Sequence, residues 1–274
     1  MKLKIILFTL LILSTSIFSQ KKSKIKGNKL VTDVYMELGD FNAIEIGDNL
    51  NVNLTQSLAN GYHIKADENL IPVVTFELLD SVLRIYTTAK ITKNKKLEIN
   101  LNFKEINQLV LKDDAEVKSL NKLDFRNLDF RALNNASYDL DIKADSSSFT
   151  LEKSTKGKLQ LAGFESVMTL NENAYLKGTI SLEYADIMMS KRADINLSGD
   201  IENLNLTATG SADIKAKNLK TSYTNLKSSN TSDIYIYVSK ELVIYAKGKS
   251  SIYVYGNPEI KVDGLNDKSQ IIKK

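Results

Sequence analysis

The sequence predicts an all-β protein, a parallel β-helix (β-solenoid) with a strand-rich entry region at its N-terminal end. Two observations carry this prediction. From Phe41 onward, apolar and polar residues alternate with period two, which is typical of half-buried strands. From about residue 105, a small residue recurs roughly every 19 residues just before an apolar alternation. Self-similarity at a fixed period of this length is the signature of a solenoid.

Residues 1–19 predict a secretory signal peptide. Lys2 and Lys4 precede an apolar run from Ile5 to Leu13, and small and polar residues follow. The apolar run is shorter than the roughly 20 residues that a membrane span needs, although an uncleaved anchor stays an alternative. We therefore expect an exported protein, located in the periplasm, on the outer cell surface or outside the cell, with no transmembrane span in the mature chain.

The chain has 274 residues and no cysteine, so an exported form must obtain its stability from packing and hydrogen bonds alone. Residues 20–37 form the leader of the mature chain, and residues 38–104 contain the entry strands. Four runs there alternate clearly: "FNAIEI", "NVNLTQ", "VLRIYT" and "KLEINLNF". The one plausible helical turn is "DENLIP" at 67–72, which we expect Pro72 to end.

In residues 105–256 the pattern predicts about eight rungs of 19 residues with two strands each. We expect residues 257–274 to form a short charged tail. The recurring small residues are Ala115, Ala136, Ala174, Ala193, Ala212, Ser232 and Ser250. One such coil cannot bury its apolar row alone, but coils stacked about 4.8 Å apart pair their backbones and bury a continuous column. An antiparallel sandwich is the rival, but the in-register series "ADI", "ADI", "SDI" favours the solenoid.

Two features resemble the family known as "putative auto-transporter adhesin, head GIN domain". The first is "FNAIEIGDNLNVNLTQS" followed by "YHIKADENLIPVVTFELLDSVLRIYT", and the second is the later series of A/S-D-I units. The resemblance covers residues 41–256, with "DS" at Asp80–Ser81 in place of the usual D/N-G turn. It implies a right-handed parallel β-helix spanning 38–256, export, a surface or cell-envelope setting, and no catalytic residues to carry over.

Asp194, Asp213 and Asp233 occupy equivalent positions of successive units, so we expect them to stack in one outward-facing column. One hypothesis is a cation ladder, most suited to Ca²⁺, which favours several oxygen ligands. The other is a solvated column balanced by Arg192 and Lys215. The sequence favours the second, because nothing resembles the glycine-rich nonapeptide that binds Ca²⁺ in other β-rolls.

Five tyrosines near the C-terminal end form a second candidate site: Tyr235, Tyr237, Tyr245, Tyr253 and Tyr255. The period predicts that Tyr235 stacks with Tyr253, and Tyr237 with Tyr255. Tyrosine supplies apolar area with a polar tip, so the group could form a strip that binds a surface glycan or protein. The alternative is cross-strand aromatic pairing that stabilises the terminal rungs.

Other chemical groups point away from catalysis. His63 is the only histidine, and no cysteine accompanies it, so a structural or surface role is expected rather than a metal or nucleophilic site. Carboxylate pairs occur at Asp113/Asp114 and Asp139/Asp141, and such pairs are the tools of glycosidases. No long cleft-forming loop or Arg-rich groove accompanies them in the sequence.

The net charge of +4 comes from scattered basic residues, which does not indicate nucleic-acid binding. The sequence calls for no cofactor. We therefore expect a non-enzymatic envelope or surface protein used for adhesion or binding, and not an enzyme. Two alternatives remain open: a carbohydrate-active enzyme on a β-helix scaffold, and a purely structural envelope component.

Overall fold

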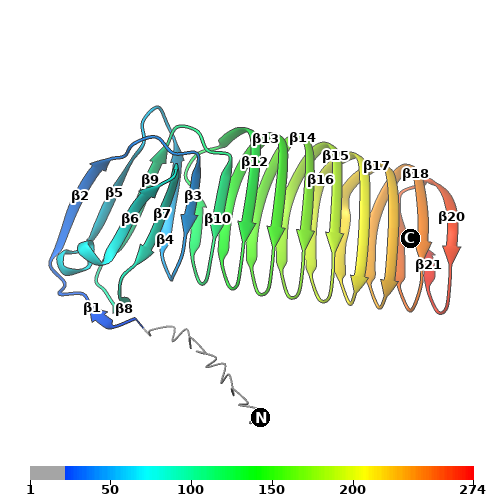
Figure 1. Ribbon diagram of the computed structural model, residues 1–274. Helices are drawn as coiled ribbons and strands as arrows, with labels where there is room; N and C mark the ends of the chain where they lie inside the picture. Colours follow the sequence, from blue (N-terminus) through cyan, green and yellow to red (C-terminus); the bar gives the residue numbers. More distant parts are fainter. Residues whose placement is uncertain (1–21) are drawn as a thin grey trace, which may run out of the picture.

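The computed structural model describes residues 22–274 and shows a β-solenoid of about nine turns with a strand-rich region at one end (Figure 1). The all-β solenoid expected from the sequence is confirmed. The predicted signal peptide lies outside the described residues. Among residues 22–274, no helix is long and apolar enough to cross a membrane.

The entry region contains nine strands and one short 3-10 helix, η1 (Glu68–Val73). The strands are β1 (Lys24–Lys26), β2 (Val31–Glu37), β3 (Ala43–Ile46), β4 (Asn51–Gln56), β5 (Gly61–Asp67), β6 (Val74–Leu79), β7 (Val82–Thr87), β8 (Lys90–Lys93) and β9 (Leu97–Phe103). The expected helical turn is present, although Pro72 lies inside it and the helix ends one residue later.

The remaining strands build the coils. They are β10 (Gln108–Leu111), β11 (Glu116–Ser119), β12 (Leu123–Ala132), β13 (Ser137–Leu151), β14 (Lys156–Leu170), β15 (Tyr175–Met189), β16 (Asp194–Gly210), β17 (Asp213–Asn230), β18 (Asp233–Ala246), β19 (Ser251–Tyr255), β20 (Glu259–Leu265) and β21 (Gln270–Lys273).

The entry region joins antiparallel pairs to a parallel stack. Strand β2 pairs antiparallel with β5, and β5 with β9. On the other side of the fold, β6 pairs antiparallel with β7. Strands β9 and β7 then pair in parallel with β4 and β3, which belong to the first coil. Strands β7 and β9 of the entry region therefore provide the sheet edges on which the first coil of the solenoid pairs.

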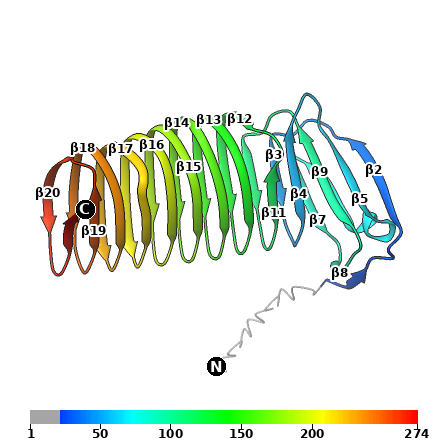
Figure 2. The ribbon, with the colours of Figure 1, turned by 180° about the vertical axis from the view of Figure 1, so that it is seen from behind.

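Each coil has two arms, and neighbouring coils pair in parallel along both arms. In β13 and β14 the register runs from Ser137↔Lys156 to Leu151↔Leu170, a shift of one 19-residue period. We call residues 137–144 and their equivalents the first arm, and residues 146–151 and their equivalents the second arm. From β13 to β18 both arms belong to one bent strand, where the sequence predicted two separate ones. Figure 2 shows first-arm strands β11 and β19 from the side opposite to that in Figure 1.

The core is a set of apolar columns inside the coils. One column on the second arm contains residues that are each at most 1% exposed: Leu109, Phe130, Phe149, Met168, Ile187, Leu206, Leu226 and Ile244. The rings of Phe130 and Phe149 lie 5.5 Å apart on adjacent coils. Each coil therefore buries its apolar residues against its neighbours, as a solenoid requires.

Tight corners connect the second arm of one coil to the first arm of the next. The small residues found in the sequence are fully or almost fully buried there, and Thr155 fills the position between Ala136 and Ala174. Two residues before each of these corner positions, the backbone adopts a left-handed conformation; in the first and last coils the corner position is occupied by Leu50 and Ser269. These positions are Asp48, Asp113, Asn134, Lys153, Glu172, Lys191, Gly210, Asn230, Gly248 and Asp267.

The segment expected to be a charged tail differs from that expectation. Residues 257–274 form β20 and β21, which pair in parallel with β18 and β19. Residues of the expected leader also join the fold, because β1 pairs with β8 and β2 with β5. Exposed charged side chains such as Lys261 alternate with few apolar residues on these strands, so the sequence pattern there is too short to indicate a strand.

The first prediction concerns Tyr138, whose buried hydroxyl has no hydrogen-bond partner among the described residues. Its ring packs edge-on against Phe130 at 4.8 Å, and burial raises the pKa of the hydroxyl. An unpaired buried hydroxyl costs about 1–3 kcal/mol, so Tyr138→Phe should raise the free energy of unfolding by about 1 kcal/mol. Urea unfolding measures the change.

The matched control is Gly157→Ala on the neighbouring coil. A Cβ at position 157 would collide with the Tyr138 ring, so this variant should lose about 1–3 kcal/mol through overpacking. A Tyr138→Phe protein that is less stable than the wild type would show that the hydroxyl has a partner.

The second prediction tests the corner geometry at Gly210, where φ is +91° and an added Cβ would lie 2.5 Å from the carbonyl oxygen of Lys191. Gly210→Ala should therefore cost about 1–2 kcal/mol or more. Gly47→Ala is the matched control, because its nearest new contact is 3.9 Å away and its φ lies outside the left-handed region. The control should be neutral or up to about 1 kcal/mol more stable in the same unfolding assay.

Candidate binding surfaces

The three aspartates of the predicted column stack in register on the first arm, Asp194 beside Asp213 and Asp213 beside Asp233. The carboxylate of Asp194 accepts the backbone N–H of Asp213 at 3.3 Å, and Lys215 donates to Asp213 at 2.5 Å. Within residues 22–274, no group of three or more acidic or histidine side chains is placed to hold a metal ion. The cation-binding role of this column stays a prediction.

The five tyrosines divide between two faces of the solenoid. On the first arm, the rings of Tyr235 and Tyr253 stack with centroids 4.5 Å apart and planes 9° apart, and Tyr237 is in register with Tyr255. Tyr245 lies on the second arm, beside Lys227. The group is therefore not one cluster.

Stacking limits what the first-arm tyrosines offer to a ligand. The facing rings of Tyr235 and Tyr253 cover one another, and the Nζ of Lys274 lies 5.2 Å from the Tyr253 centroid. Partial burial, together with Tyr253 and the nearby carboxylates, raises the pKa of Tyr235, so its hydroxyl stays protonated at neutral pH. This arrangement matches cross-strand pairing that stabilises the terminal coils, and a ligand-binding role for these tyrosines stays a prediction.

His63 lies on β5 and fastens the outer strand β2. Its Nε2 lies 2.7 Å from a carboxylate oxygen of Asp33, and its ring stacks on Tyr35 with centroids 4.2 Å apart. The hydrogen bond from His63 lowers the pKa of the Asp33 carboxyl group, and Lys65 lowers it further. Together they outweigh partial desolvation, which raises that pKa. These contacts give His63 a structural role.

The carboxylate pairs make contacts with neighbouring coils. Asp113 accepts from the side chain of Asn134 at 3.1 Å, and Asp114 accepts from Asn135 at 3.0 Å. Asp141 lies 4.0 Å from the Nζ of Lys122. These contacts link one coil to the next along the outside of the solenoid.

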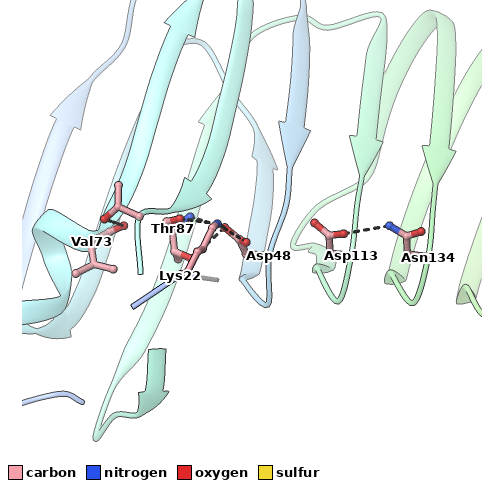
Figure 3. Close-up of polar contacts among 7 residues, drawn as sticks. Lys22, Asp48, Val73, Thr87, Asp113 and Asn134 are labelled. Carbon is pink, nitrogen blue, oxygen red and sulfur yellow. Dashed lines mark hydrogen bonds and ion pairs between the residues drawn. The ribbon is translucent and has the colours of Figure 1, made fainter. Parts of the chain in front are cut away.

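The corner around Asp48 ties the start of the described chain to the first coil (Figure 3). Asp48 accepts the backbone N–H of Thr87 at 2.7 Å and its hydroxyl at 3.0 Å. Lys22 donates to both carboxylate oxygens, at 2.5 and 2.6 Å, and to the Thr87 carbonyl oxygen at 2.7 Å. Burial alone would raise the pKa of Asp48, but the bonds from Lys22 and Thr87 outweigh it and lower that pKa.

A groove of about 280 Å³ crosses the outer face of the second arm from β14 to β18. Two outward columns form its walls, and the nearly buried residues between them form its floor. The wall beside the bend is Glu165, Tyr184, Asn203, Tyr223 and Glu241. The opposite wall is Val167, Asp186, Asn205, Asn225 and Val243, and the floor is Ser166, Ala185, Leu204 and Thr224.

Exposed aromatic rings mark this groove. Tyr184 is 46% exposed, Tyr223 is 44% exposed, and Phe164 flanks the groove with its ring 5.4 Å from that of Tyr184. The Nζ of Lys240 lies 4.8 Å from the Tyr223 centroid and 2.9 Å from a carboxylate oxygen of Glu202. Two exposed rings and several polar side chains therefore line the same groove.

Sequence reasoning missed the groove because it grouped tyrosines that are close in the chain. Tyr184 and Tyr223 are two coils apart, with Asn203 between them, and they meet only when the chain is folded. The available signal was the period itself. Aligning every outward position at coil spacing would have placed these residues in one column.

A family model described as "Putative auto-transporter adhesin, head GIN domain" matches residues 40–258. Comparison with curated proteins gave no match. Among solved structures, a "putative adhesin" from Parabacteroides merdae is similar, with a TM-score of 0.70, 20% identity, and coverage of 92% of this chain and 99% of that one.

Two proteins from Parabacteroides distasonis are also similar in fold. One is described as a "putative lipid binding protein", with a TM-score of 0.65, 18% identity, and coverage of 92% of this chain and 100% of that one. The other is a "putative adhesin", with a TM-score of 0.63, 20% identity, and the same coverage. At these identities the likeness concerns the fold.

The third prediction concerns the charge of Asp48. Its folded pKa is below the unfolded value of about 3.9, so its stabilisation is complete above about pH 5 and is lost as pH falls through the folded pKa. Asp48→Asn keeps an acceptor and tolerates the left-handed backbone but removes the charge. Asp48→Asn should lower the free energy of unfolding by about 1–2 kcal/mol at neutral pH, a value that takes the partial exposure of Asp48 into account. At about pH 3 the loss should be smaller.

Urea unfolding at both pH values measures this difference. Asp80→Asn, an exposed aspartate in the turn between β6 and β7, is the matched control and should change stability by less than about 0.5 kcal/mol. An Asp48→Asn deficit that stays constant with pH would contradict the electrostatic explanation.

Proposed function

Because the chain belongs to the family described as "putative auto-transporter adhesin, head GIN domain", we propose that it is an exported, non-enzymatic protein of the cell envelope or surface that acts in adhesion. The observation that carries this proposal is the groove on the second arm. It crosses five adjacent strands, and its walls combine two exposed tyrosines with amide and carboxylate side chains. A partner held there would be a surface glycan or a surface protein.

The rod supports this role because it presents the groove without rearrangement. Every strand that carries a groove wall is hydrogen-bonded to a neighbour on each side, from β14 to β18. The floor residues are nearly buried and packed into the core. A site that is rigid before binding loses little conformational entropy when the ligand arrives, which favours affinity.

Five carboxyl groups among the described residues have a pKa lowered by their contacts: Asp33, Asp48, Asp67, Glu98 and Glu202. None of them lines the groove. They are held ionised, which suits the ion pairs and hydrogen bonds that they make elsewhere in the scaffold.

One protein of similar fold carries a lipid-binding description, and the groove speaks against that role here. Acyl chains need an apolar lining, whereas three carboxylates line this groove: Glu165, Asp186 and Glu241. Desolvating a carboxylate against a hydrocarbon chain costs several kcal/mol. The lining therefore favours a partner that is itself polar.

The fourth prediction tests adhesion through the groove. Beads coated with the mature chain, residues 20–274, should attach to a subset of a panel of bacterial and animal cell surfaces. The double variant Tyr184→Ala/Tyr223→Ala should reduce the apparent affinity about tenfold or more, because exposed aromatic anchors dominate binding energy. Attachment is counted by microscopy or flow cytometry.

The matched control is Tyr35→Ala/Tyr175→Ala, which removes two tyrosines that lie outside the groove, one on β2 and one on the first arm of β15. Its attachment should stay within about twofold of wild type. Circular dichroism and urea midpoints confirm that both double variants are folded. No attachment to any surface, or equal attachment by both double variants, would contradict the proposal.

A further inference from the structure

The charge of the groove excludes one class of ligand. Its walls contain Glu165, Asp186 and Glu241, and neither a lysine nor an arginine lines it among the described residues. Glu241 is paired with Lys261 at 2.6 Å, and Glu165 accepts the hydroxyl of Ser146 at 2.9 Å. Among the described residues, Glu165 and Asp186 have no lysine or arginine partner, so an acidic polymer would meet like charge there, and we expect a ligand without acidic groups.

The amide groups of the groove suit a ligand with many hydroxyl groups. Asn205 and Asn225 are in register on adjacent coils, and Asn203 stands on the opposite wall. Each amide side chain offers both donors and an acceptor, so it can bind two neighbouring hydroxyls at once. The parallel strands place such groups about 4.8 Å apart along the rod.

The tyrosines suit a ligand with apolar ring faces. Tyr184 and Tyr223 stand on the same wall two coils apart, which corresponds to about 10 Å along the rod. Both rings are nearly half exposed, and the Nζ of Lys240 lies over one face of the Tyr223 ring, 4.8 Å from its centroid. The C–H face of a pyranose ring packs against such an aromatic surface, while the phenol hydroxyl reaches the sugar's polar edge. Successive rings of a linear polymer can use both platforms.

An extended peptide fits this groove less well. Peptides bind β-proteins most often by adding a strand to an exposed sheet edge, where main-chain hydrogen bonds supply affinity. The strands under the groove have both edges occupied by neighbouring coils. The groove therefore offers side chains alone, and its repeat matches a polymer that carries its polar groups on every unit.

From these observations we infer that the groove binds a neutral, linear glycan lying along the axis of the solenoid. The inference rests on the proposed adhesive function and names the ligand class of the same site. Tyr184 and Tyr223 pack against sugar rings from one wall. Asn205 and Asn225 bind hydroxyl groups of the same sugars from the opposite wall. The carboxylates accept further hydroxyl hydrogen bonds and repel acidic polysaccharides.

Affinity electrophoresis of the mature chain, residues 20–274, tests this inference. Separate gels contain neutral polysaccharides (β-glucan, galactomannan, unsubstituted xylan, mannan and chitosan-free glycol chitin), and a further gel contains polygalacturonate. We expect retardation by at least one neutral polysaccharide and none by polygalacturonate. Calorimetry with oligosaccharides of the retarding polymer then gives the Kd.

Variants assign the binding to the groove. Tyr184→Ala and Tyr223→Ala should each raise the Kd about tenfold or more, and Asn205→Ala should raise it about fivefold or more. Tyr35→Ala, at an exposed tyrosine on β2 outside both candidate sites, is the matched control and should stay within about twofold. Retardation by polygalacturonate, no retardation in any neutral gel, or unchanged affinity of the tyrosine variants would overturn the inference.

Treatment of the target cells separates this inference from the proposed function. Periodate, which cleaves vicinal diols of glycans, should abolish bead attachment, and protease should not. Attachment that survives periodate but is lost after protease, and that still needs Tyr184 and Tyr223, would overturn the glycan ligand and leave the adhesive function intact. An absence of attachment together with retardation in a neutral gel would overturn the adhesive function alone.

Discussion

The parallel hydrogen-bond ladder between coils one period apart is the constraint on which the rest of this structure depends. It fixes which residues are neighbours, because a residue on β13 meets its partner on β14 one 19-residue period later. It also satisfies the backbone polar groups of the inner coils, so apolar side chains alone can fill the interior. Without cysteine, this ladder and the columns inside it carry the stability of the rod.

The 19-residue period made much of the fold predictable from the sequence. The elements that were missed are those whose residue types depart from the repeating pattern. The apolar alternation and the small corner residues could be read directly, but Thr155 interrupted the small column although it is buried there like Ala136. The terminal strands β20 and β21 were missed because lysine and aspartate surround their few apolar residues. The left-handed corner residues left no residue-type signal, since Lys153, Glu172 and Lys191 share a conformation that usually favours glycine or asparagine.

The candidate sites show the same limit in another form. The stacking of Asp194, Asp213 and Asp233 followed from the period, and so did the pairing of Tyr235 with Tyr253. Grouping the five tyrosines by their closeness in the chain overlooked that Tyr245 lies on the other arm, although two strands per unit already separate its run from that of Tyr235. The groove was missed because its walls are assembled from five strands with no local motif, and only alignment at the coil period brings their residues into columns.

The placement of the irregularities explains why the groove can be continuous. The coils are not all of equal length, and the register shifts between Asn196 and Ser198 and between Ala216 and Lys220 absorb extra residues within the first arm. A further shift lies at the bend, between Thr221 and Tyr223. From Tyr223 onward the second arm is back in register, so Asn205, Asn225 and Val243 still form one straight wall. Because a ligand that lies along the rod needs unbroken columns, such a ligand can bind on the second arm between β14 and β18, where the groove columns stay in register.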